Sequence, residues 1–235
     1  MKKISVEIWS DIVCPFCYIG KRRLENALAN FPHADAIEIH WRSFELDAEA
    51  DPKPGQSLYQ VLAAKYGNTE QWARQMCADM TKSAAAEGLA FDFDQAVLAN
   101  TFRAHRLVHL AAQHGRQDAA KERLFMAYLE EGRDINDIST LQELAAELGL
   151  PAAEVGQVLT TDIFAEEVRH DEYQARQIGV RGVPYFVFDN KYAVSGAQPT
   201  ELFEQVLAKV WAEAAPQHVQ LTSPDGASCD LDGTC

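Results

Sequence analysis

Hydrophobic and polar residues alternate near the start of the chain and again about thirty residues later. Apolar side chains occupy every second position from Ile4 to Ile8, and a similar two-residue period returns in residues 37–44. Such alternation is typical of a strand with one buried face. Between the two segments, residues 15–31 place apolar side chains three or four positions apart, which predicts a helix. The first 45 residues therefore predict a β-α-β unit.

A long helical region separates this unit from the remaining strands. Helical spacing of apolar residues predicts helices over residues 58–66, 69–87, 95–114, 119–130, 139–148 and 151–179. Strand patterns follow at residues 183–188 and 192–195, joined by a turn at Asp189 and Asn190, and a last helix is expected over residues 199–214. We expect one α/β layer from residues 1–50 and 180–215. An all-helical insertion over residues 51–179 interrupts it, and residues 216–235 are expected to form a flexible tail.

Composition and charge limit the classes of partner. Hydrophobic residues make up 47% of the chain and charged residues 24%, as in ordinary globular proteins. The formal net charge of −14 argues against nucleic acid or an anionic membrane as a partner. Polar residues interrupt the apolar ones in the first segment, and no run is long enough to span a bilayer, so we expect a cytoplasmic protein. Cysteines in motifs are usually redox-active, catalytic or metal-binding in that compartment.

Two of the five cysteines, Cys14 and Cys17, form a CxxC motif where the first strand gives way to a helix. At a helix N-terminus, free N–H groups and the helix dipole stabilise a thiolate, and Pro15 suits the first helical turn. Cys17 follows one turn later, and Pro15 and Phe16 between the cysteines influence the balance of thiol and disulfide. A CxxC beside a β-α-β pattern predicts a thioredoxin-like redox site. A zinc site needs a further Cys or His pair at suitable spacing, so no metal is expected.

Pro184 stands at the start of the third predicted strand, after Val183. Proline cannot donate to a sheet ladder, so it belongs at a strand's first residue or on an edge. Pro184 is then either a simple strand starter or a cis proline beside the CxxC that leaves the preceding backbone free to pair with an extended substrate. Because cis bonds occur at only about 5–6% of X–Pro positions, the residues alone do not choose between these interpretations.

Taken together, these motifs resemble the DsbA family of thioredoxin-fold proteins, and residues 10–21, 100–106 and 179–186 resemble its FrnE-type branch. The resemblance implies a thioredoxin lobe with a helical insertion and a thiol–disulfide oxidoreductase activity. It assigns Cys14 as nucleophile, Cys17 as resolving thiol and Pro184 as a cis residue after Val183. Protein thiols and disulfides or small thiols are the implied substrates. No tightly bound cofactor is implied, with glutathione a candidate substrate or reductant. The usual CPWC of the branch is CPFC here.

Two other function classes stay open at this point. Kappa-class glutathione transferases and 2-hydroxychromene-2-carboxylate isomerases share the fold but generally carry Ser at the position of Cys14, and they do not require Cys17. A redox-linked chaperone would use apolar surface around the CxxC without turnover. The presence of both cysteines favours thiol–disulfide exchange.

Three cysteines lie outside the motif. Cys229 and Cys235 form a pair in the predicted tail, and the resemblance supports an auxiliary redox pair that relays electrons to or from the CxxC. Cys77 is predicted to be a buried small hydrophobe in a helix. Asp11 and His105 are candidates for side chains that surround the site: Asp11 precedes Cys14 by three residues, and His105 lies in a segment that carries the family resemblance.

Overall fold

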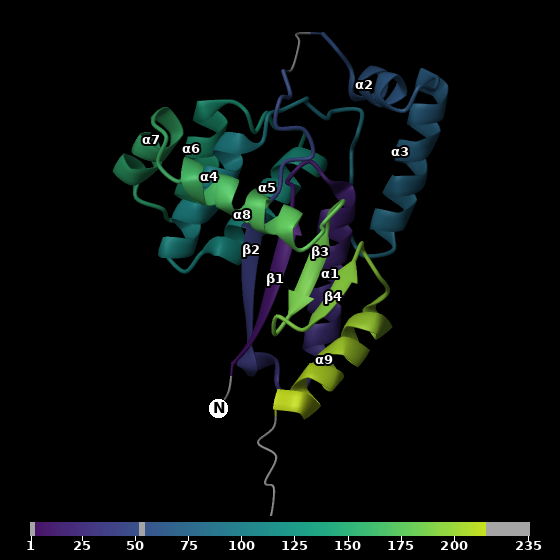
Figure 1. The fold of residues 1–235 in the computed structure, drawn as a ribbon. Helices are drawn as coiled ribbons and strands as arrows, with labels where there is room; N and C mark the ends of the chain where they lie inside the picture. Colours follow the sequence, from purple (N-terminus) through teal and green to yellow (C-terminus); the bar gives the residue numbers. More distant parts are fainter. Residues whose placement is uncertain (1–2, 52–54, 215–235) are drawn as a thin grey trace, which may run out of the picture.

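The computed structural model describes residues 3–51 and 55–214, and the elements follow the predicted order (Figure 1). The β-α-β unit consists of β1 (Ile4–Ser10), α1 (Pro15–Ala29) and β2 (Ile37–Ser43), with a short 3-10 helix before β2. The chain finishes with β3 (Tyr185–Phe188), β4 (Tyr192–Ser195) and α9 (Thr200–Ala214). The predicted tail, including Cys229 and Cys235, lies outside the described residues.

The strands form one mixed sheet in the order β2-β1-β3-β4. β1 and β2 are parallel, whereas β3 is antiparallel to both β1 and β4. Residues 189–191 join β3 to β4, with the turn at Asp189 and Asn190 as predicted, and these two residues have positive φ, at 49° and 54°. Two such residues match the right-handed twist of a hairpin, and Asn and Asp tolerate this conformation better than most residues.

Helices pack on both faces of the sheet, over different extents. On one face, Ile4 and Ile8 of β1 are fully buried in the main core, to which α1 and α9 contribute Leu24 and Phe203. Trp9 belongs to a second, smaller cluster with Ala175 of α8 (Ala165–Gln177). The alternation in β1 therefore separates a fully buried face from one that is half-buried at Ser5 and Glu7 and buried at Trp9.

The insertion between β2 and β3 is helical throughout its regular elements. Its helices are α2 (Leu58–Lys65), α3 (Glu70–Ala85), α4 (Phe102–Gln113), α5 (Gln117–Leu129), α6 (Ile138–Glu147), α7 (Ala152–Thr160) and α8. Figure 1 shows α2 and α3 on one side of the end of the sheet and α4, α6 and α7 on the other, with α5 and α8 close to the strands between them. Both α5 and α8 contact β2. The predicted fold class, an α/β layer with a large helical insertion, is confirmed, whereas the exact lobe boundaries stay a prediction.

One predicted helix begins too early. Residues 95–101 are not helical, and α4 begins at Phe102 instead. The side chain of Asn100 accepts the backbone N–H of Phe102 and donates to the carbonyls of Ala48 and Ala50. These bonds hold the segment against the loop after β2, and short polar side chains of this type compete with helix formation.

The predicted helix over residues 151–179 is two helices, α7 and α8. Phe164 separates them with a left-handed φ of 65°, and the carbonyl of Thr161 accepts a hydrogen bond from Arg106. The chain turns here because a tertiary contact replaces helical hydrogen bonds. The third strand also begins later than predicted, at Tyr185, since Pro184 cannot take part as a donor in the ladder.

No helix within residues 3–51 and 55–214 combines the length and apolar character needed to cross a bilayer.

Candidate active site

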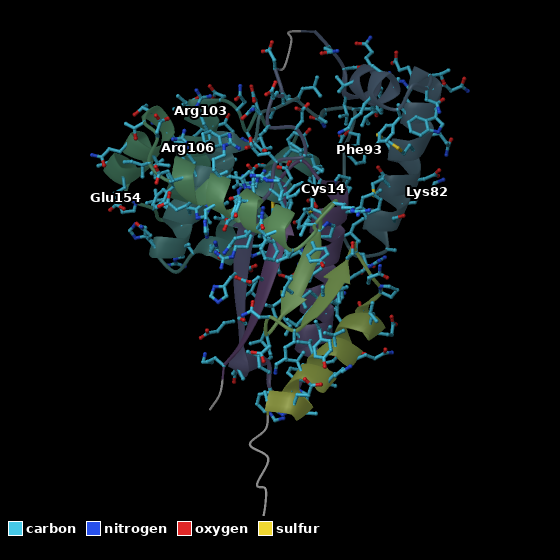
Figure 2. All side chains as sticks on the ribbon, in the orientation of Figure 1. Cys14, Lys82, Phe93, Arg103, Arg106 and Glu154 are labelled. Atoms are coloured by element: carbon cyan, nitrogen blue, oxygen red, sulfur yellow. The ribbon has the colours of Figure 1, made fainter. Side chains whose placement is uncertain are left out.

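Cys14 occupies the N-cap position of α1, at the end of the sheet that faces the inserted helices (Figure 2). Its own N–H donates to the carbonyl of Asp11 at 3.2 Å, and its carbonyl accepts the N–H of Cys17 at 3.0 Å. Pro15 begins the helix, and the first turn contains no acidic residue. The positive end of the helix dipole therefore acts on the Cys14 sulfur without a competing carboxylate on the same turn, as the motif predicts.

Both motif cysteines are free thiols, and they differ in accessibility. Cys14 keeps 4% of its surface exposed and Cys17 none, whereas Phe16 between them is 50% exposed. The N-terminal cysteine of such a motif is expected to be the exposed nucleophile, and here Cys14 is almost fully buried. The cause of this burial is the loop before β3: the Sγ of Cys14 donates to the carbonyl of Val183 at 3.6 Å.

The peptide bond between Val183 and Pro184 is cis, as the family resemblance implies. The carbonyl of Pro184 accepts the N–H of Gly196 at 2.8 Å. On its other side the Pro184 ring lies against Gly20 of α1, where a Cβ would come within 3.0 Å of the ring Cγ. A glycine at this position therefore lets the proline loop approach the helix that carries both cysteines.

Asp11 and His105 form a buried pair below the motif. His105 of α4 places Nε2 3.2 Å from Oδ1 of Asp11, and the N–H of Leu46 donates to Oδ2 at 2.8 Å. Burial by itself would raise the pKa of Asp11, but the contact with His105 and the bonds from Leu46 and Thr101 hold it below its usual value. Burial lowers the pKa of His105 more than Asp11 raises it. The pair is thus an ionised carboxylate that accepts a hydrogen bond from a neutral imidazole.

Sequence motifs do not indicate Lys121 of α5, which is also buried beside the site. Its side chain is 1% exposed, and Nζ donates to the carbonyl of Ser10 at 3.4 Å. Nζ also lies 5.3 Å from the ring centroid of Trp41 and 5.0 Å from that of Phe125. Burial lowers the pKa of Lys121 to about 8, and the charges of Cys17, Asp11 and Cys14 act in the opposite direction.

The spacing of apolar residues in the sequence indicates that this lysine is buried. Lys121 stands three, four and seven residues before Leu124, Phe125 and Tyr128, all of which are buried on α5. A charged residue within an apolar stripe of this spacing is either buried or disrupts the stripe.

The electrostatic surroundings of Cys17 follow from these neighbours. Burial raises the pKa of the Cys17 thiol well above its ordinary value, and the hydrogen bond and charge of Cys14 raise it further. The charge of Lys121 and a backbone hydrogen bond from Asp11 lower it. Among the described residues, the site therefore combines a thiol at a helix N-terminus, a deeply buried second thiol and a buried cation.

Comparison with known proteins agrees with this geometry. The sequence model of the DsbA-like thioredoxin domain family matches residues 5–208. The chain belongs to the DsbA-like family. The crystal structure of a probable DsbA oxidoreductase from Streptomyces coelicolor is 44% identical, with a TM-score of 0.85 over 99% of this chain and 98% of that one. The Bacillus subtilis protein YwbO is 26% identical over 207 residues, which are 87% of this chain and 96% of YwbO.

A more distant structure shares the fold of this DsbA-like protein. The cytosolic disulfide reductase DsbM from Pseudomonas aeruginosa is 18% identical, with a TM-score of 0.63 over 89% of this chain and all of that one. At this identity the likeness supports the fold, and the chemistry has to be argued from the site.

A second buried polar cluster of the DsbA-like chain lies around Asp171 of α8. Its carboxylate accepts the N–H of Ser43 at 2.8 Å and lies 3.3 Å from Nε2 of His109, which is also 3.0 Å from the Ser43 hydroxyl. His105 and His109 therefore have different carboxylate partners. Within the described parts of the chain, no group of three or more His, Cys, Asp or Glu side chains is arranged to hold a metal ion.

Cys77 lies on α3, away from the motif in the sequence, and is 5% exposed. Burial raises the pKa of its thiol to about 11. Because a thiol with a raised pKa is a poor nucleophile at neutral pH, this supports the prediction that Cys77 packs as a small hydrophobe.

Proposed function

We propose that this protein catalyses thiol–disulfide exchange, with Cys14 as the nucleophile and Cys17 as the resolving thiol. The observation that carries the proposal is the position of Cys14, at the N-terminus of α1 and against the carbonyl of Val183 in the cis-proline loop. Membership of the DsbA-like family supports the same chemistry.

The proposed reaction proceeds through a mixed disulfide. The Cys14 thiolate attacks one sulfur of a substrate disulfide, the substrate S–S bond breaks, and one substrate sulfur leaves as a thiolate that takes up a proton. The Cys17 thiolate then attacks Cys14, the mixed disulfide breaks, and the second substrate sulfur leaves. Two electrons pass to the substrate, and Cys14 and Cys17 become a disulfide. The reverse sequence oxidises a substrate dithiol.

Protein thiols and disulfides or small thiols such as glutathione are the proposed partners, and no tightly bound cofactor takes part. Phe16, inside the motif, is 50% exposed. Leu46, whose N–H donates to Asp11, is 41% exposed, so both residues present apolar surface near the site. The N–H of Val183 makes no hydrogen bond to another residue of the described chain, and it is the proposed donor to an extended substrate segment.

Reduction of insulin disulfides in the presence of dithiothreitol tests the proposal. Cys14→Ser should reduce turnover to the uncatalysed rate, and Cys17→Ala should accumulate the mixed disulfide with substrate. Cys77→Ala is the control because its thiol is buried on α3, and its turnover should match the parent protein. Full activity of Cys14→Ser would exclude the mechanism. Glutathione-dependent turnover of a small aromatic substrate that survives Cys17→Ala would favour the isomerase class instead.

The tail pair is a separate proposal. If Cys229 and Cys235 relay electrons to the CxxC, a double Cys→Ser variant should turn over more slowly whenever the terminal reductant is not a small dithiol. Equal turnover of this variant and the parent protein would remove the relay.

A further inference from the structure

Lys121 is a buried cation that makes no ion pair with a carboxylate of residues 3–51 or 55–214. In the described part of the chain its side-chain nitrogen has one hydrogen bond, to the carbonyl of Ser10, and no acidic group lies within ion-pair distance. Lys21 provides the contrast: it is equally buried, but its Nζ pairs with three carboxylates, those of Glu25, Asp118 and Glu122. A buried ammonium ion is costly unless a negative charge compensates it, and the carboxylates of Asp11 and Asp171 act on Lys121 only from beyond ion-pair distance.

The resolving step of the proposed reaction creates such a charge. Cys17 is fully buried, and it can attack the mixed disulfide only as a thiolate. In the mixed disulfide Cys14 has no charge, so the sulfur of Cys17 is the thiolate that forms below the motif. Lys121 lies on α5, which contacts α1, and its Nζ donates to the carbonyl of Ser10, four residues before Cys14. From this position its positive charge lowers the pKa of the Cys17 thiol.

We propose that Lys121 is the counter-charge that stabilises the Cys17 thiolate during resolution of the mixed disulfide. This inference rests on the proposed exchange activity and adds to it a residue from the helical insertion. Lys121 is not itself a nucleophile and does not contact the substrate; it acts through Cys17.

Protons and electrons balance in this step. Cys17 loses its proton, and the thiolate pairs with the Lys121 ammonium while it attacks the Sγ of Cys14. The Cys14–Cys17 bond forms, the bond from Cys14 to the substrate sulfur breaks, and the substrate leaves as a thiolate that takes up a proton. Once the internal disulfide has formed, the buried ammonium has lost its counter-ion, so oxidation should favour the neutral amine.

Cys17 and Lys121 consequently share one titration. Loss of one proton from the pair gives either thiol plus amine or thiolate plus ammonium, and the second form is the reactive one. The resolution rate should therefore rise with pH until the pair has lost that proton, near the value of about 8 to which burial lowers the pKa of Lys121, and then become constant. The other titratable groups that face Lys121 are Cys14, Asp11, His105 and Asp171.

The experiment is a stopped-flow reaction with 5,5′-dithiobis(2-nitrobenzoate). In a full-length protein with Cys77→Ala, Cys229→Ser and Cys235→Ser, only the CxxC reacts. The attack of Cys14 releases one equivalent of thionitrobenzoate, and the attack of Cys17 on the mixed disulfide releases the second. The rate of the second release is measured from about pH 6 to about pH 10, a range that contains the ordinary thiol pKa of about 8.5 and the lowered pKa of Lys121, about 8.

Lys121→Met keeps an unbranched side chain and removes the charge. We expect a second phase slower by about tenfold for each pKa unit that Cys17 gains, with a rate that keeps rising where the parent rate is constant. Lys121→Gln, a neutral polar replacement, should behave in the same way. Lys21→Met is the matched control, since it removes a buried lysine that pairs with carboxylates, and it should keep the parent's pH profile.

The outcomes separate the two proposals. If the first or second equivalent is not released from the parent protein, the exchange activity itself is wrong. If both are released and the Lys121 variants retain the parent's rate and pH profile, the role of Lys121 is wrong. If a Lys121 variant fails to fold by circular dichroism, the parent profile still decides: a rate that continues to increase with each pH unit up to pH 10 overturns the inference.

Discussion

Gly20→Ala adds one methyl group where α1 packs closely against the proline loop. Its effect on the free energy of unfolding should therefore differ from that of the same substitution at an uncrowded helical glycine. Gly20 lies inside α1, and a Cβ there would be 3.0 Å from Cγ of Pro184 and 3.1 Å from Cζ of Phe186. Both neighbours are buried, so neither moves freely. Gly156 of α7 is the matched control, because a Cβ at that helical position would meet nothing within 4 Å.

The magnitudes follow from these two environments. Replacement of a helical glycine by alanine stabilises a helix by about 1 kcal/mol, and this gain applies at both positions. Overpacking of a filled core costs about 1–3 kcal/mol, and this cost applies only at Gly20. Gly156→Ala should therefore raise the free energy of unfolding by about 1 kcal/mol, whereas Gly20→Ala should leave it unchanged or lower it by up to about 2 kcal/mol.

Urea unfolding followed by tryptophan fluorescence measures both values, with the slopes compared to confirm that the unfolded state is unchanged. Displacement of Pro184 would also move the Val183 carbonyl that lies 3.6 Å from the Cys14 sulfur. Insulin turnover should thus fall for Gly20→Ala and stay constant for Gly156→Ala. Equal stabilisation by both substitutions, with full activity, would refute the role of this contact.

Two further predictions concern buried carboxyl groups. Asp11→Asn should lower the free energy of unfolding by about 2–4 kcal/mol at neutral pH, because hydrogen bonds to a charged group contribute about 1.5–3 kcal/mol each and Asp11 accepts from Leu46 and His105. The folded-state pKa of Asp11 is depressed, so this difference should be complete above the unfolded value of about 3.9 and decline as pH falls through the folded value. Urea unfolding at a series of pH values checks this, and a difference that does not shrink in acid would contradict it. Burial raises the pKa of Glu45 to about 7, so its contribution should be present below the unfolded pKa of about 4.3 and be lost as pH rises through about 7. Glu45→Gln should flatten that decline in stability, and an unchanged slope would show that another group causes it.

The strands and the CxxC could be predicted because their signals are local. Alternation in residues 4–8 and 37–44 depends only on which face of a strand is buried, and Cys14 is placed by the strand-to-helix junction that precedes Pro15. The cis bond at Pro184 came from the family resemblance alone, since the residues favour a trans bond. Local signals were therefore sufficient to predict the strands and the position of both cysteines, but not the isomer of the Pro184 bond.

The parts that sequence patterns missed depend on contacts between distant segments. The start of α4 is displaced by bonds from Asn100 to a loop fifty residues earlier, and the break after α7 involves a contact of Thr161 with Arg106. Lys121 was missed because a lysine usually indicates solvent, and only its position within an apolar stripe indicates otherwise. Each case is a polar group whose partner is set by the fold and not by its neighbours in the chain.

The helical insertion contributes side chains to the active site. The α/β layer supplies the helix N-terminus and the proline loop, but the imidazole that holds Asp11 comes from α4 and the ammonium near Cys17 comes from α5. Both inserted helices contact the layer directly or through these side chains, and both groups are buried beside it. The insertion therefore forms part of the active site. Substitutions on α4 and α5 should alter the ionisation of the Cys14 and Cys17 thiols although the CxxC itself is unchanged. A DsbA-like chain that kept the CxxC but lacked α4 and α5 would expose Cys17 to water. The thiolate of Cys17 would then have no ammonium group beside it to compensate its charge.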